Sequence, residues 1–440
     1  MNNGFKANMD CRFYTEYGIQ VEFIIIDDFL SSRKAFEANE VDLLWCTVDA
    51  LPTEMGRNGT MIMDNPKIIF QADWSRGGDA IVVDASISSM SDLKGKSVAV
   101  AEGTPSHSFL INLLKSNGMS LSDVNVKSVP NAIDAANMFK QGAVDAAVVW
   151  SPDDIDCVKK VPGSKILAST KEATHIIADC FIAKEDCINN NKEKLQKFYD
   201  AWMVGASELN SNLKGARSVA AKILANEFQM SESDALASMD NVRYTTHGDN
   251  MNFFGLGDAN SVTGDMLYTS MSGEYIKIGL VENPLFWRDV SDVTFVKNST
   301  LSGNAHLAEL GKTFPESTDE YKTKQSYSTK KVVINFQSGS SSLTGEAIAT
   351  INREFVEIAK TNAGARIRIE GNTDNTGSVE LNRTLSLQRA QSVVNYLVSQ
   401  FGFDKNRFIV VGNGSKHAIN AGSIGANENY RTTEFHLIKE

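Results

Sequence analysis

One stretch near the C-terminus, residues 369–397, constrains this chain of 440 residues more than any other. It reads IEGNTDNTGSVELNRTLSLQRAQSVVNYL, and the alternating RIRIEG at its start predicts a strand. A polar turn, NTDNTG, follows, and then a helix with one basic residue, Arg389, beyond its opening turn. This order predicts that the acid Asp374, at the strand end, lies near the base Arg389.

The pair of opposite charges is suited to a small zwitterion. A guanidinium pairs best with a carboxylate, and a carboxylate binds an ammonium group. Residue types alone also allow an ordinary surface salt bridge. Helical spacing predicts that Arg389 points away from an apolar stripe and towards the turn. The stripe consists of Leu387, Ala390, Val394 and Val398.

The spacing TDNTGxxxxNxxLSxxRAxxVxxYL resembles the OmpA-like peptidoglycan-binding domain. The resemblance spans about 332–438 and includes FQSGSSSL near its start and RTTEF near its end. It implies a small α+β domain in which Asp374 and Arg389 hold the diaminopimelate residue of the peptide stem. The other positions that it assigns to this site are Thr373, Asn382, Leu385 and Arg431.

Two positions depart from the family pattern. The usual Gly-His-Thr-Asp has Asn372 in place of His, and Thr432 replaces one of two paired arginines. Neither change removes Asp374 or Arg389, so we expect binding to persist at an altered affinity.

Length and charge indicate more than one module, because 440 residues exceed one ordinary core. Residues 331–440 hold 12 Lys and Arg against 10 Asp and Glu, whereas residues 1–330 hold 31 against 44. The net charge of −11 argues against a nucleic-acid partner. ESTDEYKTKQSYSTK, within residues 313–330, has no apolar period and predicts a linker.

Before the linker, strands and helices alternate, which predicts a parallel-type α/β sheet. VEFIIIDDF and VDLLWCTVDA are expected to be buried strands, and LKGKSVAVAEG begins a second series. TPSHSFLINLLKSNG predicts a helix with Thr104 as N-cap and Pro105 first. SPDD predicts another helix, capped by Ser151.

Aromatic and polar residues gather at the predicted strand ends, as in a small-ligand cleft. The first turn of the TPSHSFL helix adds the backbone N–H groups of Ser106 and His107, a generic anion site. Thr47, Asp73 and Ser75 lie at the same strand ends. The candidate ligand-binding residues are Trp45, Asp49, Trp74, Asp79, Thr104, Ser106 and Trp150.

The segments VDLLWCTVDALPTE, DWSRGGDAIVV, LKGKSVAVAEGTPSHSFL and VDAAVVWSPDD together resemble solute-binding proteins of the nitrate/sulfonate/taurine type. The resemblance implies a bilobal type-II periplasmic-binding-protein fold over residues 1–312, with ligand between the lobes. Lobe I would hold about 1–82 and 178–312, and lobe II about 83–177, with hinges near 82–91 and 170–177. Members begin with a strand before the first helix, so we expect either a missing strand or a truncated N-terminus.

Other classes of function find little support in the sequence. The six histidines show no HExxH or GxSxG spacing, so no catalytic residues, metal or cofactor are expected. The five cysteines form no CxxC pair. No apolar run approaches the roughly 20 residues of a membrane helix, and the polar start shows no signal peptide.

These observations predict a binding protein of the periplasm or cell envelope, not an enzyme. Its N-terminal module would bind a small solute, and residues 331–440 would bind peptidoglycan. A membrane transporter or an envelope complex would be the further partner. The alternative is a wall-anchored scaffold or sensor whose lobes bind a protein or have a degenerate cleft.

Overall fold

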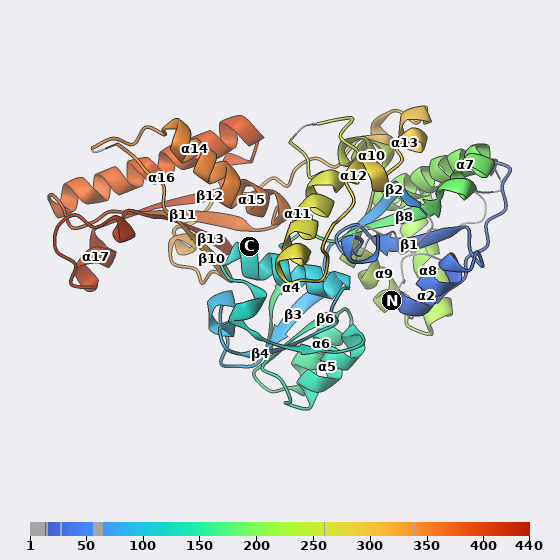
Figure 1. The fold of residues 1–440 in the computed structure, drawn as a ribbon, viewed down its shortest axis with the longest axis horizontal. Coiled ribbons are helices and arrows are strands. Elements are labelled where there is room, and N and C mark those ends of the chain that lie inside the picture. The colour runs from blue at the N-terminus through green and yellow to red at the C-terminus, as the bar shows by residue number, and fades with distance from the viewer. Residues whose placement is uncertain (1–13, 15, 27–28, 56–64, 259, 338) are drawn as a thin grey trace.

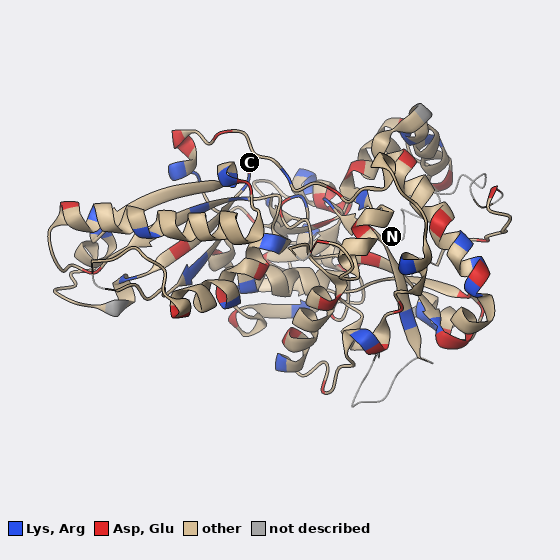
Figure 2. Cartoon of the chain, turned by 90° about the horizontal axis from the view of Figure 1, so that it is seen from above, with Lys and Arg blue, Asp and Glu red and all other residues tan. Residues whose placement is uncertain are grey.

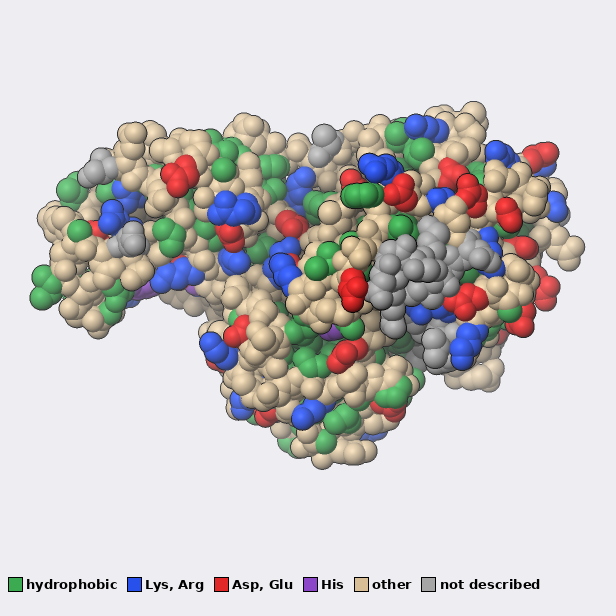
Figure 3. Space-filling view, viewed as in Figure 1, with side chains coloured by type: hydrophobic (Ala, Val, Ile, Leu, Met, Phe, Trp, Pro, Cys, Tyr) green, Lys and Arg blue, Asp and Glu red, His purple; other side chains and the backbone are tan. Residues whose placement is uncertain are grey.

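The computed structural model describes residues 14, 16–26, 29–55, 65–258, 260–337 and 339–440. Their strands form three sheets, each with its own helices (Figure 1). We call the unit around the first sheet lobe I, the unit around the second lobe II, and the third the C-terminal domain. In Figure 3 the C-terminal domain projects to the left of the two lobes as an arm.

Lobe I is built on a four-stranded sheet of order β1-β8-β2-β9, in which all pairings are antiparallel. Its strands are buried because helices cover both faces, and an aromatic cluster of Phe70, Phe181 and Trp202 fills one side. The strands are β1 (Leu43–Thr47), β2 (Pro66–Ser75), β8 (Ala178–Lys184) and β9 (Val242–Tyr244). The helices are α2 (Phe29–Glu37), α3 (Pro52–Met55), α7 (Glu185–Ser211), α8 (Ala216–Phe228), α9 (Glu232–Ser238), α10 (His247–Phe253), α11 (Gly264–Lys277), α12 (Trp287–Val290) and α13 (Thr294–Asn298).

Lobe II has a five-stranded mixed sheet of order β5-β4-β6-β3-β7. The pairings of β4 with β5 and β6 are parallel, and those of β3 are antiparallel. Its strands are β3 (Asp79–Val83), β4 (Ser97–Val100), β5 (Asn125–Ser128), β6 (Ala146–Trp150) and β7 (Lys165–Ser169). Its helices are α4 (Pro105–Ser116), α5 (Ala132–Lys140) and α6 (Asp153–Lys160).

Three sequence-based expectations need correction here. The parallel pattern holds only for β5, β4 and β6, because the chain crosses between lobes and returns antiparallel. Residues 21–26, expected within a buried strand, form none, although Val21 and Phe23 pack on the core of lobe I; residues 27–28 lie outside the described part. Helix α6 begins at Asp153 with Pro152 at the N-cap, instead of being capped by Ser151.

The chain crosses between the lobes twice. The second crossing, between β7 and β8, spans 170–177, where a hinge was expected. The first crossing was expected at 82–91, but β3 pairs with β6 and β7 and so belongs to the second sheet. The first crossing therefore lies at 76–78. The amide of Gly77 donates to Thr170 Oγ1 at 2.7 Å, which ties the two crossings together.

The C-terminal domain follows the expected order of elements, and its sheet has the order β10-β13-β11-β12. Its long helix α16 carries charged residues only in its N-terminal half (Figure 2), and its buried residues along both halves pack on the sheet. The strands are β10 (Ser328–Val332), β11 (Arg366–Asn372), β12 (Phe408–Gly414) and β13 (Thr433–Ile438). The helices are α14 (Gly345–Ile351), α15 (Glu357–Thr361), α16 (Val379–Phe401) and α17 (Lys416–Asn420). Among the described residues, no helix combines the length and the apolar character needed to cross a membrane.

The segment expected to be a linker, 313–330, lies against the C-terminal domain. Phe314 is buried, and its amide donates to Asp404 Oδ2 at 2.7 Å. Arg368 donates to the carbonyl oxygens of Tyr321 and Lys324 at 3.1 and 2.8 Å, and β10 already begins at Ser328. These contacts are made by backbone groups and by single side chains. Such contacts do not require apolar residues at regular spacing, so the sequence shows no apolar period here. The exact domain boundaries remain a prediction.

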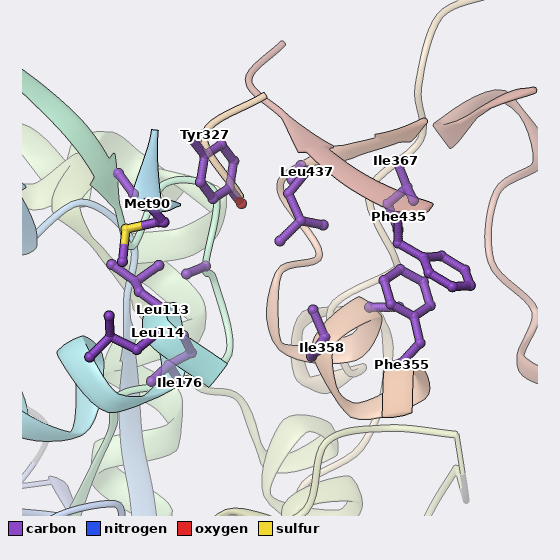
Figure 4. Close-up of a cluster of buried hydrophobic side chains, with 14 of the residues drawn as sticks. Met90, Leu113, Leu114, Ile176, Tyr327, Phe355, Ile358, Ile367, Phe435 and Leu437 are labelled. Atoms are coloured by element: carbon purple, nitrogen blue, oxygen red, sulfur yellow. The ribbon is translucent and has the colours of Figure 1, made fainter. Parts of the chain in front are cut away.

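One hydrophobic core joins lobe II to the C-terminal domain (Figure 4). Tyr327 lies between the two groups of side chains, and its carbonyl oxygen accepts from the amide of Met90 at 2.8 Å. The side chains on the lobe II side are Met90, Leu113, Leu114 and Ile176, and those on the other side are Phe355, Ile358, Ile367, Phe435 and Leu437.

The same interface reaches the second crossing. The amide of His175 donates to the carbonyl oxygen of Thr361, and the amide of Gly364 donates to that of Glu172, both at 3.0 Å. A Cβ atom on Gly364 would lie only 2.2 Å from the carbonyl oxygen of Lys171, so only glycine fits this contact.

We predict that Gly364→Ala lowers the free energy of unfolding by about 1–3 kcal/mol, because two backbone segments must separate. Urea denaturation of the full chain measures it. Gly311→Ala is the matched control, since its added Cβ meets nothing within 4 Å. Equal stability of the two variants would contradict this description of the interface.

Candidate functional site

The first candidate site lies where β11 ends and α16 begins, and we call it the clamp site. Glycines allow the helix to approach the sheet closely: a Cβ atom on Gly371 would lie 2.2 Å from the carbonyl oxygen of Ser386. The Ser378 hydroxyl caps α16 by accepting from the amide of Leu381 at 3.2 Å. Asn382 donates to the carbonyl oxygen of Thr376 at 3.0 Å and so fixes the turn that carries Asp374.

Asp374 is 7% exposed and is held by the backbone. Its Oδ1 accepts from the amide of Thr376 at 3.1 Å, and its Oδ2 accepts from that of Asn427 at 3.3 Å. Arg431 Nε lies 3.2 Å from Oδ2, and the Arg431 side chain is half exposed. A fixed, nearly buried carboxylate therefore has an exposed and replaceable cationic partner.

Arg389 does not face Asp374 as directly as the sequence predicted. Its Nε donates to the carbonyl oxygen of Ser340 at 3.0 Å, its Nη2 donates to that of Gln337 at 3.3 Å, and its guanidinium lies over Phe336. Within the described residues, the ion pair of Asp374 is with Arg431. Burial lowers the pKa of Arg389; nearby Arg431 adds to this effect and Asp374 opposes it.

The helix is also rotated slightly from the expected orientation. Leu387, placed on the apolar stripe by spacing, is 46% exposed, while Val393 and Leu397 are buried. Arg389 is consequently at the edge of the buried face, where the loop before α14 covers it.

The remaining predicted residues surround the clamp site. Thr373 is buried, and among the described residues its hydroxyl has no hydrogen-bond partner. Leu385 is half-buried on α16. Asn372 and Thr432, the two departures from the family pattern, contact each other through Asn372 Nδ2 and Thr432 Oγ1 at 3.3 Å. Neither departure inserts a bulky group between Asp374 and Arg431.

A possible metal-ligand group in the same domain consists of Glu370, Glu434 and His436, whose ligand atoms lie within 4.8 Å of one another. Arg368 and Asn413 already donate to the two carboxylate oxygens of Glu370, both at 2.6 Å. The guanidinium of Arg368 therefore already supplies the positive charge that a metal ion would bring, and the group is an ion-pair network.

The second candidate site lies between the lobes and contains four aspartates, which we call the interlobe acidic group. They are Asp49, Asp73, Asp79 and Asp179. On the sheet of lobe I, Asp179 lies directly opposite Thr47 on one side and Asp73 on the other. On lobe II, Asp79 begins β3 opposite Trp150. Ser75 donates to Asp79 Oδ2 at 2.7 Å across the first crossing.

All four carboxyl groups have a pKa above the usual value for aspartate. Burial raises the pKa of Asp49 to about 8, that of Asp79 to about 7 and that of Asp179 to about 6. Burial also raises the pKa of Asp73, and the charge of Asp179 raises it further. Desolvation disfavours the charged carboxylate, and neighbouring carboxylates add to the effect.

Several predicted ligand residues converge on this group. Asp49 and Asp79 belong to it, and Trp150 donates a hydrogen bond that lowers the pKa of Asp79 in part. Trp45 packs in the core of lobe I, but its Nε1 donates to Asp179 Oδ1 at 2.6 Å. Trp74, by contrast, packs against His175 and Phe253 in a second core of lobe I.

The predicted anion site at the start of α4 is only partly formed. Helix α4 begins at Pro105 after Thr104, as expected, but the Thr104 hydroxyl donates to the carbonyl oxygen of Ala101. The amide of His107 donates to the carbonyl oxygen of Thr104 at 2.9 Å. Burial lowers the pKa of His107 to about 4, so this side chain supplies no positive charge. Ser106 is fully buried.

The sequence interpretation missed Asp179 and did not select Asp73. Asp73 was visible at the end of a strand. Asp179 follows an Ala at the start of β8, and its importance comes from β8 pairing between β1 and β2. That pairing is a long-range feature, which the local pattern of HIIADCFIA does not encode.

We predict that Asp49→Asn stabilises the ligand-free protein more at pH 7.5 than at pH 5, by about 1–3 kcal/mol. Folded Asp49 retains a proton that the unfolded chain has released. The contribution of this protonated carboxyl group to the free energy of unfolding is complete below the unfolded pKa, and it is lost as pH rises towards about 8. Urea denaturation at the two pH values measures the difference. The control Asp42→Asn exchanges an exposed carboxylate just before β1. An equal gain at both pH values would contradict the burial of a protonated Asp49.

Comparisons with known proteins agree with this arrangement. The OmpA family model matches residues 335–432, and the NMT1/THI5-like model matches residues 78–212. A putative binding protein of Brucella abortus is 27% identical over 219 residues, which cover 48% of this chain. The chain spans 64% of that relative's length. A putative aliphatic sulfonates-binding protein of Escherichia coli is 35% identical over 72 residues, which cover 16% of this chain and 22% of that protein.

Solved structures share the fold of the two lobes. The periplasmic aliphatic sulphonate binding protein SsuA of Escherichia coli superposes with a TM-score of 0.54 at 17% identity, covering 72% of this chain and 95% of that chain. The alkanesulfonate-binding protein SsuA of Xanthomonas axonopodis pv. citri, bound to MOPS, gives 0.51 at 13% identity, covering 66% and 94%. The chain therefore carries an NMT1/THI5-like segment within a periplasmic-binding-protein fold, followed by an OmpA-family domain.

Proposed function

We propose that this protein is a solute-binding protein anchored to the cell wall in the periplasm or cell envelope. The observation that carries the proposal is that one chain holds two groups of buried polar side chains at separate places. The clamp site lies in the OmpA-family domain, and the interlobe acidic group lies where two lobes meet. A shared hydrophobic core connects the two modules.

The clamp site would bind the diaminopimelate residue of peptidoglycan. Arg431 is half exposed and lies 3.2 Å from the nearly buried Asp374 carboxylate, so an ammonium group of the ligand can take its place. Arg389 uses Nε and Nη2 for backbone carbonyl oxygens, and within the described part Nη1 has no recorded partner. This nitrogen would donate to the carboxylate of the ligand. Thr373, Asn382 and Leu385 would complete the site.

The interlobe group would bind a small solute by reversible closure of the lobes, without covalent chemistry. The chain crosses between the lobes at 76–78 and at 170–177, and these segments would absorb the motion. A ligand shifts the equilibrium between open and closed forms only by its differential affinity for them. The interlobe candidates remain Trp45, Asp49, Trp74, Asp79, Thr104, Ser106 and Trp150, to which Asp73 and Asp179 are added. A membrane transporter or envelope complex would receive the solute.

We predict that Asp374→Ala and Arg389→Ala each reduce the fraction of protein that co-sediments with purified peptidoglycan by at least about tenfold, the equivalent of one lost charge-assisted contact. Arg383→Ala is the matched control, because Arg383 lies on the exposed side of the same helix. Unchanged co-sedimentation of both clamp variants would remove the wall-binding assignment.

A second prediction addresses the lobes. At least one compound in a panel of small anions, sulfonates and amines should raise the melting temperature, since a ligand that binds only the folded state must stabilise it. At 100 times its Kd the gain is about 2.7 kcal/mol. Differential scanning fluorimetry of the full chain measures it. If no compound in a broad panel stabilises the protein, the lobes serve as a scaffold or sensor, and wall binding is unaffected by that result.

A further inference from the structure

The interlobe acidic group is arranged in a row with a defined geometry. Thr47 on β1, Asp179 on β8 and Asp73 on β2 are directly opposite one another in register. Residues opposite one another on neighbouring strands have their side chains on the same face of the sheet, about 5 Å apart. Three polar side chains of lobe I thus form a continuous row at the edge nearest lobe II.

Lobe II and the first loop of lobe I bring two more carboxyl groups to this row. Asp79 begins β3, and Asp49 follows the end of β1. Asp79 and Asp179 each raise the pKa of Asp49 through their charges, as they do for Asp73, so all four groups lie within electrostatic reach. Asp49, Asp73 and Asp79 are each at most 6% exposed.

Unsatisfied polar atoms in the row point to a missing partner. Thr47 is 7% exposed and shares the face of Asp179, and its buried hydroxyl makes no hydrogen bond to any described residue. The Oδ1 of Asp73 is also without a partner among those residues, and the oxygens of Asp49 have none within hydrogen-bond distance, although the Ser108 hydroxyl is close enough to lower the pKa of Asp49. Buried polar groups of folded proteins are nearly always paired, so this many unpaired atoms in one place is typical of a binding site without its ligand.

The charges around the row determine which ligand it can hold. No Lys, Arg or His of the described part forms an ion pair with any of the four aspartates. Burial lowers the pKa of His107, on α4, to about 4, so its ring carries no charge near neutral pH. Within the described part, a sulfonate would therefore meet carboxyl oxygens and no ion-pairing Lys, Arg or His side chain. A cation would neutralise the carboxylates and let them lose their protons.

We propose that the lobes close on a small organic cation that carries N–H donors, such as a protonated amine, amidine or guanidine. This inference rests on the proposed solute-binding function and specifies the class of solute. Asp73 and Asp179 bind the cation from lobe I, and Asp79 binds it from lobe II. Trp45 acts as a positioning residue, because its Nε1 already donates to Asp179 Oδ1 at 2.6 Å.

The proposed ligand carries N–H donors because the polar side chains of the row are hydrogen-bond acceptors. Carboxylate oxygens accept and do not donate once ionised, and the Thr47 hydroxyl can also accept. A quaternary ammonium ion has the charge without the donors. It should therefore bind more weakly than an amine or guanidine of similar size. The proteins of known structure described above carry names that mention sulfonates, so this chain would differ from them in the charge of its ligand.

The test is isothermal titration calorimetry of the full chain at pH 7.5 with four probes: agmatine, putrescine, choline and ethanesulfonate. We expect agmatine or putrescine to bind, choline to bind at least tenfold more weakly, and ethanesulfonate to give no heat. Asp73→Asn, Asp179→Asn and Asp79→Asn should each weaken the binding of the better cation at least tenfold. Asp42→Asn, an exposed aspartate of lobe I, should leave it unchanged. Melting curves of each variant establish that it is folded.

Binding of ethanesulfonate with equal or higher affinity than the amines would overturn the cation assignment and leave the solute-binding function standing. Unchanged cation binding in all three interlobe variants would also overturn it, because the cation would then bind elsewhere. If none of the four probes binds, the assignment fails. The broader stabilisation panel then decides separately whether the lobes bind any solute.

Discussion

The packing of lobe II against the C-terminal domain is the interaction on which the arrangement of this molecule depends. Tyr327 is buried between apolar side chains of both units, and backbone hydrogen bonds extend the contact to the second crossing. A flexible linker would let the two modules sample many relative positions. Here the polar segment that joins them is bound along the C-terminal domain, so the two candidate sites have a fixed spatial relation.

Both candidate sites contain carboxyl groups that are withdrawn from water. In the clamp site, backbone amides hold Asp374, which pairs with the half-exposed side chain of Arg431. Between the lobes, the Oδ1 of Asp73 has no partner among the described residues, and burial raises the pKa of both Asp49 and Asp73. Desolvated charges interact strongly with a matching ligand, at a cost to the stability of the unliganded protein.

Local patterns in the sequence predicted local structure well. The spacing around Asp374 identified the strand, turn and helix, and Thr104 and Pro105 marked the start of α4. Features that depend on distant residues were not predictable. Asp73 and Asp179 meet only because β8 inserts between β1 and β2, and Arg389 is held by carbonyl oxygens from a loop about 50 residues earlier. The segment 313–330 has no apolar period and so predicts a linker, because its contacts, such as those of Phe314, are not periodic.

The position of Lys115 has a consequence for how the molecule would move. Its Nζ lies 3.0 Å from Glu357 of the C-terminal domain and 3.8 Å from Glu274 on α11 of lobe I. The contact with Glu357 lies within the fixed pair of units, whereas the contact with Glu274 spans the lobes. Opening would therefore have to break the contact with Glu274, and also the hydrogen bond that Ser270 of α11 donates to Glu357 at 2.5 Å. If the C-terminal domain binds the wall as proposed, lobe II would be held with it, and lobe I would be the body that moves.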